Sequence, residues 1–502
     1  MPETPRTYQT LIRSNCNEPL SDYATLMAHV ERCLFADFSK GKKPIDLKSS
    51  YISRFGITAR QFNAIRVSLD GKIDSIKELK LLHIEQKKEQ IAALLDYLPD
   101  IKKAKVVHEK KRRLATLRCK LKKLEKQRDE KTVSLCFGSK QLFRKQFHLE
   151  ENGYESHADW KYDWQEARSS QIFFLGSKDE TGGNQTCTAS LVEDGSISLR
   201  VRLPDSLAEK HGKYIFIPNL RFAYGHEELT AAIRDCELRK ELSLMKDPSS
   251  KNYGQAITFR FKKGSKGWYV LATTDINSPS LITNKGRGVI GLDINSDHLA
   301  VTELDRFGNA VTTHTFPIPY KNATNSQMRA AIGDASKQIT LLCETTRKPL
   351  ILENLDFQNK KAQLKEKNHS YARMLSAFAY QLIITHLKSR GASKGIGVYS
   401  VNPAFTSLIG RINYAERYGL STHHAAALCI GRRYLGFSEK MPSGQREIPD
   451  GKGGHVTLDL PARNRSRHVW KQWGQLNRKC SAALTARFRT AKADPRARQN
   501  SS

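Results

Sequence analysis

The chain has 502 residues, 39% of them hydrophobic, and a formal net charge of +32. Its length accommodates about two to four domains with real cores, and the charge favours a polyanionic partner. No apolar run approaches the roughly 18 residues of a membrane span, and the N-terminus lacks the apolar core of a signal peptide, so a soluble cytoplasmic protein without a membrane partner is expected.

The nine cysteines are scattered, and none forms a C-x-x-C pair. This spacing supports neither a disulfide framework nor a zinc ribbon. The basic residues recur along the whole chain instead of clustering beside an apolar helix face, which makes nucleic acid a better partner than a membrane surface.

The first part of the chain is predicted to hold one strand in residues 1–19, at 7–13, and then a helical domain over 20–133. One helix starts behind Ser21-Asp22 and another behind Thr58, because such residues cap helix N-termini. Residues 102–131 form a very basic helix whose leucines, at 114, 117, 121 and 124, keep one face apolar. We interpret its cations as contacts for phosphates, in preference to a merely solvated face.

Residues 134–275 change to short strands separated by Gly and Asn turns, which predicts a small β-barrel or sandwich. Phe259 and Phe261 alternate with Arg260 and Lys262, as in a half-buried strand with a basic outer face.

Residues 276–445 have an α/β pattern that begins with a buried strand, Val289 to Leu292, ending at one acid, Asp293. Two more runs, 299–304 and 310–316, follow after turns. Three consecutive antiparallel strands with an aspartate on the first are how a ribonuclease-H-like nuclease domain begins.

A second aliphatic strand, 350–355, also contains one carboxylate, Glu353. A hydrophobic strand tolerates a buried acid only when a cation or a metal compensates it. Two acids on neighbouring strands could share Mg²⁺ ions about 3.5 to 4 Å apart, one activating water and one stabilising the leaving oxygen.

The remaining elements are a helix over 370–388, a strand over 397–401 and a helix around Ala425, Ala426 and Ala427. Residues 446–502 are basic, with Trp470 and Trp473 as expected anchors and a disordered end from about residue 490.

The segments GLDIN (291–295), LENLDF (352–357), VNPAFTS (401–407) and AAALCIGRR (425–433) together resemble the TnpB proteins of bacterial insertion sequences, relatives of type V CRISPR effectors. The resemblance covers nearly the whole chain. It implies a multidomain α+β protein with a helical recognition lobe, a wedge-type β-barrel and a RuvC-like nuclease domain. It also implies a transposon-encoded guide RNA, a target in double-stranded DNA beside a short adjacent motif, and Mg²⁺-dependent cutting.

Two positions depart from the family. The usual four-cysteine zinc ribbon is missing, since 408–422 contains no cysteine, and no zinc is expected. The third acid of the family falls on His423, followed by His424. An imidazole can ligate a metal or donate a proton, but it removes one negative charge from the site.

Three alternatives remain for this third position. His423 serves directly, or another acid replaces it, with Asp334 the best placed and Glu303 weaker, or the site is inactive. The hypothesis from the sequence is therefore an RNA-guided, Mg²⁺-dependent DNA endonuclease with Asp293, Glu353 and either Asp334 or His423 in its site. The alternative is an RNA-guided DNA-binding protein that acts by occupancy; the retention of both Asp293 and Glu353 favours the enzyme. A strand-joining transposase is disfavoured, because no tyrosine nucleophile context is found.

Overall fold

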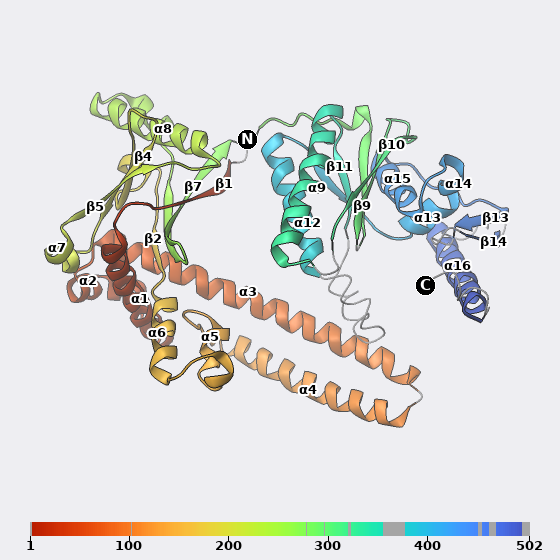
Figure 1. Cartoon of the computed structure of the whole chain (residues 1–502), viewed down its shortest axis with the longest axis horizontal. Coiled ribbons are helices and arrows are strands. Elements are labelled where there is room, and N and C mark those ends of the chain that lie inside the picture. Colours follow the sequence, from red (N-terminus) through yellow and green to blue (C-terminus); the bar gives the residue numbers. More distant parts are fainter. Residues whose placement is uncertain are drawn as a thin grey trace. The chain divides into compact units, whose positions relative to one another are not determined.

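The structure is a computed structural model that describes residues 3–101, 103–277, 279–295, 297–319, 323–354, 377–449, 454–460 and 468–493 (Figure 1). The chain divides into two compact units, residues 1–88 with 111–277 and residues 89–110 with 278–502. The prediction of a mixed α+β chain with more than one compact unit is confirmed. Within the described ranges, no helix combines the length and apolarity needed to cross a bilayer.

Helices dominate the first part of the chain, and Thr58 shows why one of them starts where it does. The Thr58 hydroxyl accepts a hydrogen bond from the amide of Gln61 at 3.2 Å, and the Gln61 side chain accepts one from the Thr58 amide at 2.8 Å. This reciprocal cap satisfies two donors that the first helical turn leaves unpaired. The helices are α1 (Asn17–Ser39), α2 (Pro44–Phe55), α3 (Ala59–Tyr97), α4 (Ala104–Asp129), α5 (Lys140–Lys145), α6 (His157–Arg168), α7 (Asp205–His211) and α8 (His226–Leu244).

The strands of the first unit form two open sheets, ordered β1-β7-β6-β2 and β3-β4-β5. They are β1 (Glu3–Leu11), β2 (Gln171–Phe174), β3 (Cys187–Leu191), β4 (Ile197–Arg202), β5 (Tyr214–Leu220), β6 (Thr258–Gly264) and β7 (Gly267–Asn277). The described residues therefore do not form the expected wedge-type barrel, because no strand pairs the edge of one sheet with the edge of the other. In β6, Phe259 and Phe261 are buried and Arg260 and Lys262 are exposed, as the alternation predicted.

The second unit is built on a five-stranded sheet of order β10-β9-β8-β11-β12. The strands are β8 (Val289–Ile294), β9 (His298–Leu304), β10 (Ala310–Pro317), β11 (Leu350–Glu353) and β12 (Val398–Val401). The first three are antiparallel neighbours, whereas β11 is parallel to both β8 and β12. The predicted run of three antiparallel strands followed by a further acid-bearing strand is thus present.

Helices cover both faces of this sheet (Figure 1). They are α9 (Asn325–Thr346) and α12 (Ala377–Lys394) on one face and α15 (Thr422–Leu435) on the other. The unit also contains α13 (Thr406–Asn413), α14 (Ala415–Tyr418) and α16 (Val469–Ala493), and a hairpin of β13 (Gly444–Pro449) and β14 (His455–Leu460) follows α15. α16 continues to Ala493, so its last residues overlap the start of the end that the sequence predicts to be disordered, and residues 494–502 lie outside the described ranges.

The two faces of the sheet belong to different cores. Ile290 and Leu292 of β8 pack with α9 and α12, whereas Val289 of β8 and Ile351 of β11 pack with α13, α15 and α16. This follows from the strand period of two, which sends successive side chains to opposite faces. We call the second surface the α15 face.

Glycines let the helices of the α15 face approach closely. A Cβ on Gly291 of β8 would overlap the carbonyl oxygen of Ala427 in α15, and a Cβ on Gly410 of α13 would overlap that of Ala425. Glycine is the residue that permits such backbone contact. The glycine of the GLDIN segment therefore fixes how close α15 lies to the sheet.

Candidate active site

Asp293 lies at the end of β8 on the α15 face, with its side chain only 10% exposed. Its Oδ2 accepts a hydrogen bond from the side-chain Nδ2 of Asn295 at 3.1 Å and lies 3.1 Å from Nδ1 of His423. A carboxylate buried at the end of an apolar strand is thus compensated by two neighbours that approach the same oxygen. Among the described residues, Oδ1 has no hydrogen-bond partner.

Glu353 lies at the corresponding point of the next strand. β8 and β11 pair in parallel with Ile290 opposite Leu350 and Gly291 opposite Ile351. Continuing that register by two residues sets Asp293 opposite Glu353, on strands about 4.8 Å apart and on the same face. The two predicted acids therefore end side by side at one edge of the sheet.

A hydroxyl and a backbone contact orient Glu353. Thr406, at the start of α13 and 1% exposed, donates its hydroxyl hydrogen bond to Oε1 of Glu353. The hydroxyl of Tyr380 in α12 donates to the Glu353 carbonyl oxygen at 3.0 Å. Arg433 of α15 donates to the carbonyl oxygen of Ala404 at 2.9 Å and also to that of Asn402, which fixes the loop that delivers Thr406.

His423 reaches Asp293 because of the way α15 crosses β8. The close contact is between Gly291 and Ala427. His423 lies one helical turn before Ala427, about 6 Å along the helix, and Asp293 lies two residues beyond Gly291, about 6.6 Å along the strand. These two distances are about equal, so the side chain of His423, in the first turn of α15, reaches the Asp293 carboxylate. The His423 side chain is 45% exposed.

A second imidazole and a second acid lie beside His423. The rings of His298 and His423 meet edge to face, with centroids 4.9 Å apart. Nδ1 of His298 lies 2.8 Å from Oδ1 of Asp297. The hydrogen bond with His298 is the largest cause that lowers the pKa of Asp297, so this carboxyl stays ionised over a wider range of pH.

His424 points away from this group. Its Nδ1 lies 2.9 Å from the Ser421 hydroxyl, and its Nε2 lies 3.2 Å from the carbonyl oxygen of His314 in β10. Burial lowers the pKa of His424 and so favours the neutral ring. His424 therefore joins α15 to the edge of the sheet and does not face the acids.

The structure does not bring Asp334 to the two acids. Asp334 is exposed on α9. The buried residues of this helix, such as Ile332 and Ala335, pack on the face opposite the α15 face. The helix that contains Asp334 therefore lies behind the sheet from Asp293.

Glu303 also lies away from the pair, in a separate ion pair. It is opposite Ile290 in the β8–β9 register, and its Oε1 is 2.6 Å from Nζ of Lys348. Thr312 donates a hydrogen bond to its other oxygen at 3.0 Å. The buried charge of Glu303 is thus balanced by Lys348, which gives this acid a structural explanation.

No family model matches the chain. An uncharacterised protein of Saccharolobus solfataricus is 26% identical over 278 residues, which are 53% of this chain and 69% of that protein. The chain also shows structural similarity to RuvC and to Cas12 effectors.

The structural matches are distant. RuvC of T. thermophilus in complex with a Holliday junction substrate matches with a TM-score of 0.22 and 14% identity, over 30% of this chain and 97% of that chain. A CRISPR-Cas12f ternary complex matches with 0.19 and 11%, over 85% and 98%. A Cas12i-crRNA-dsDNA complex matches with 0.26 and 10%, over 88% and 67%. At these scores, the description of the site rests on its own geometry.

Two carboxylates at the ends of adjacent strands are the chemical donors for a magnesium ion, but the ligand atoms of Asp293, Glu353 and His423 do not all lie within 4.8 Å of one another. Carboxylate oxygens are the ligands that Mg²⁺ prefers, and Asp293 and Glu353 offer them from adjacent strands on one face. Thr406 and Asn295, which sequence reasoning did not select, orient these carboxylates. Their positions inside VNPAFTS and GLDIN were the available signal.

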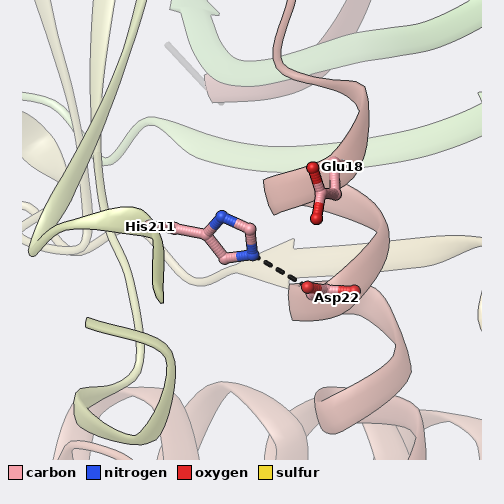
Figure 2. Close-up of side chains that lie close together, drawn as sticks. All are labelled: Glu18, Asp22 and His211. Carbon is pink, nitrogen blue, oxygen red and sulfur yellow. Dashed lines mark hydrogen bonds and ion pairs between the residues drawn. The ribbon is translucent and has the colours of Figure 1, made fainter. Parts of the chain in front are cut away.

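A different acid–histidine group, Glu18, Asp22 and His211, lies in the first unit (Figure 2). Nζ of Lys210 is 2.8 Å from both Glu18 and Asp22, and Nε2 of His211 is 2.8 Å from Asp22. The hydrogen bond from Lys210 is the largest cause that lowers the pKa of each carboxyl. A lysine already neutralises this group, and ion pairing accounts for it.

Proposed function

We propose that this chain is an RNA-guided, Mg²⁺-dependent DNA endonuclease of the TnpB type, with Asp293 and Glu353 as metal ligands and His423 as the third group of the site. The observation that supports it best is the parallel register of β8 and β11, whose continuation by two residues sets Asp293 opposite Glu353. The order of the five strands fits the ribonuclease-H-like domain that the resemblance implies. Asp334 is left out of this proposal because its helix covers the other face.

The residues of the chain have separable tasks in this site. Divalent ions held by Asp293 and Glu353 would activate water and stabilise the leaving oxygen of a phosphodiester. Thr406 and Asn295 hold the two carboxylates in fixed orientations. His423, held at Nδ1 by Asp293 and partly exposed, presents Nε2 as an imidazole nitrogen that could act as a general acid or base.

The charge of the chain suits guided recognition. When base pairing with a guide RNA selects the target, the protein needs to hold phosphate backbones more than to distinguish bases. A net charge of +32 spread along the chain meets that need. The proposed partners are accordingly a guide RNA and double-stranded target DNA, and the proposed setting is the cytoplasm of a cell with the parent transposon.

One observation favours a second candidate, an RNA-guided DNA-binding protein that acts by occupancy. His423 stands where the family has its third acid and contacts Oδ2 of Asp293. It removes one negative charge from the site, which lowers the attraction for cations. Such a protein would retain the fold and the nucleic-acid surface and would not cut.

A cleavage assay separates the two candidates. Purified protein with its co-purifying RNA is incubated with a matched plasmid in Mg²⁺ or EDTA. The endonuclease predicts cutting that requires Mg²⁺ and is abolished by Asp293→Ala, while target binding is retained. The exposed Asp334, changed to Asn, is the matched control and leaves cutting unchanged.

The variant His423→Asp completes the test, because it restores the family's third acid at the same place. Binding without nicking in the unsubstituted protein, together with cutting by His423→Asp, assigns the protein as an occupancy binder whose histidine disables it. Cutting by the unsubstituted protein that falls by about tenfold or more in His423→Ala assigns His423 a role in the reaction. Absence of RNA-dependent target binding would overturn both candidates.

A further inference from the structure

An exposed tryptophan stands at the start of α16. Trp470 is 42% exposed, whereas Trp473, one turn later, is 2% exposed and belongs to the core of the α15 face. Of the two tryptophans that the sequence predicted as anchors, Trp473 is buried in this core and Trp470 is partly exposed. The exposed part of an indole offers a large flat surface to a partner.

Trp470 is held in place by an aromatic ring and a cation. The rings of Phe405 and Trp470 meet edge to face with centroids 6.1 Å apart. The Arg433 guanidinium lies 5.9 Å from the centroid of the Trp470 ring. Because Arg433 also binds the backbone of the loop at Asn402 and Ala404, the indole is fixed to the same loop that delivers Thr406.

The indole is close to the proposed site through a short series of contacts. Phe405 directly precedes Thr406, and the Thr406 hydroxyl bonds to Glu353. Phe405 has φ +60°, a conformation that is uncommon for a bulky residue and that sets where its ring points. Only Phe405 and Thr406 therefore separate the Trp470 ring from a carboxylate of the site.

All the charged residues of α16 are cationic. Residues 469–493 contain no Asp or Glu. Three exposed cations, Lys471, Arg478 and Lys479, are spaced seven and eight residues apart and lie along one side of the helix. They cover about 10 to 12 Å, at 1.5 Å per residue. A row of cations alone is usually just solvated, but here it starts beside a partly exposed indole that contacts the loop of Thr406.

We propose that Trp470 stacks on a base of the DNA single strand that enters the site of Asp293 and Glu353, and that Lys471, Arg478 and Lys479 bind phosphates of that strand. Aromatic stacking with flanking cations is how proteins hold single strands without reading their sequence. A base inside a duplex is already stacked on both faces, so the exposed indole selects an unpaired strand. This inference rests on the proposed guided DNA binding, but it does not require cutting.

Photo-crosslinking tests the contact directly. The RNA-loaded protein with Asp293→Ala is bound to a matched target that contains 5-iododeoxyuridine at successive positions of either strand, and crosslinked peptides are mapped by mass spectrometry. The proposal predicts a crosslink at Trp470 from one position or two adjacent positions of a DNA strand. Crosslinks of Trp470 to the guide RNA alone, or to no nucleic acid, would overturn it.

Affinity measurements supply the second readout. We expect Trp470→Ala to weaken binding of a 12-nucleotide oligodeoxythymidine by about fivefold or more, and Trp470→Phe to lose less, because one stacked base contributes at least that much. Phe307→Ala is the matched control. Phe307 is 61% exposed under the Arg306 guanidinium, in the turn after β9, at the end of the sheet opposite Asp293. An equal loss in Phe307→Ala contradicts the proposal.

The triple variant Lys471→Gln, Arg478→Gln and Lys479→Gln covers the case in which Trp470→Ala misfolds, since these side chains are exposed. The triple variant should reduce the slope of log affinity against log salt by about 0.7 per phosphate contact. An unchanged slope would refute phosphate binding by these three residues. If the protein crosslinks at Trp470 but does not cut, only the proposed nuclease function is refuted. If it cuts but does not give this crosslink, only the proposed stacking by Trp470 is refuted.

Discussion

The hydroxyl of Thr406 gives the sharpest test of how the site is organised. It is buried at 1% exposure and donates to Oε1 of Glu353, with the Pro403 carbonyl oxygen 3.0 Å away as its other acceptor. Thr406→Val keeps the shape of the side chain and removes the hydroxyl. A hydrogen bond to a charged group contributes about 1.5 to 3 kcal/mol. Removing a partner that orients a metal-binding carboxylate typically costs about 10- to 100-fold in metal affinity or activity.

Metal affinity and cutting activity are both measured for Thr406→Val. Mn²⁺, used as a stand-in for Mg²⁺, is titrated into the RNA-loaded protein and followed by water-proton relaxation, and the same preparations are assayed for cutting over a range of Mg²⁺. We expect the metal midpoint to rise about 10- to 100-fold in Thr406→Val and to return towards the original value in Thr406→Ser, which retains a hydroxyl.

A buried threonine outside the site provides the control. Thr340 of α9 is 3% exposed and donates to the carbonyl oxygen of Ser336 at 2.8 Å. Thr340→Val should leave the metal midpoint unchanged. The positioning role of Thr406 is refuted if Thr406→Val binds metal as the unsubstituted protein does, or if Thr340→Val shifts the midpoint equally.

Two further predictions concern the second unit. Lys348→Met should destabilise this unit by about 3 to 5 kcal/mol, because Glu303 is left buried without its cation. The double variant Lys348→Met with Glu303→Gln should recover most of that loss in a urea unfolding experiment. Equal losses in both variants would exclude a charge effect. The lowered pKa of His424 means that the unfolded chain binds more protons near and below the ordinary value of 6.5, so stability should fall as pH drops through that range. His424→Gln should flatten that dependence in thermal unfolding between about pH 7 and 5, and an unchanged slope would rule out His424 as its source.

The sequence predicted that Asp293 and Glu353 would lie close together because each ends a run of aliphatic residues. Asp293 and Glu353 follow short aliphatic runs that predict buried strands, and parallel neighbours bring their carboxyl ends to one edge. Gly291, which lies against α15, was visible in the sequence as part of GLDIN. That this glycine allows the Ala427 backbone to approach β8 depends on tertiary packing, and only the structure shows it.

The third position was harder to predict, for reasons that are physical. A helix acid such as Asp334 has the same sequence surroundings whichever face of the sheet its helix covers, and here α9 covers the face of Ile290 and Leu292. Glu303 looks like a buried catalytic acid until Lys348, which is 45 residues away in the chain, is seen to balance it. Sequence spacing reports local periodicity and says little about which distant residue supplies the opposite charge.

Sheet closure was unpredictable for a similar reason. The strands of the first unit were recognised by alternation, as at Phe259 and Phe261, but alternation gives only the inner and outer face of each strand. Whether the sheet closes depends on which edges pair. β1 pairs with β7 and β2 pairs with β6, so the first sheet ends at β1 and β2 and remains open.

The placement of residue 423 follows from packing and does not depend on its own chemistry. Gly291 admits the backbone of α15 at Ala427, and one turn of helix then matches two residues of strand, so whichever side chain stands at 423 projects towards Asp293. Histidine at this point changes the charge of the site and leaves its geometry in place. For that reason, His423→Asp alters chemistry without moving α15, and its effect on cutting reports what the missing third charge does.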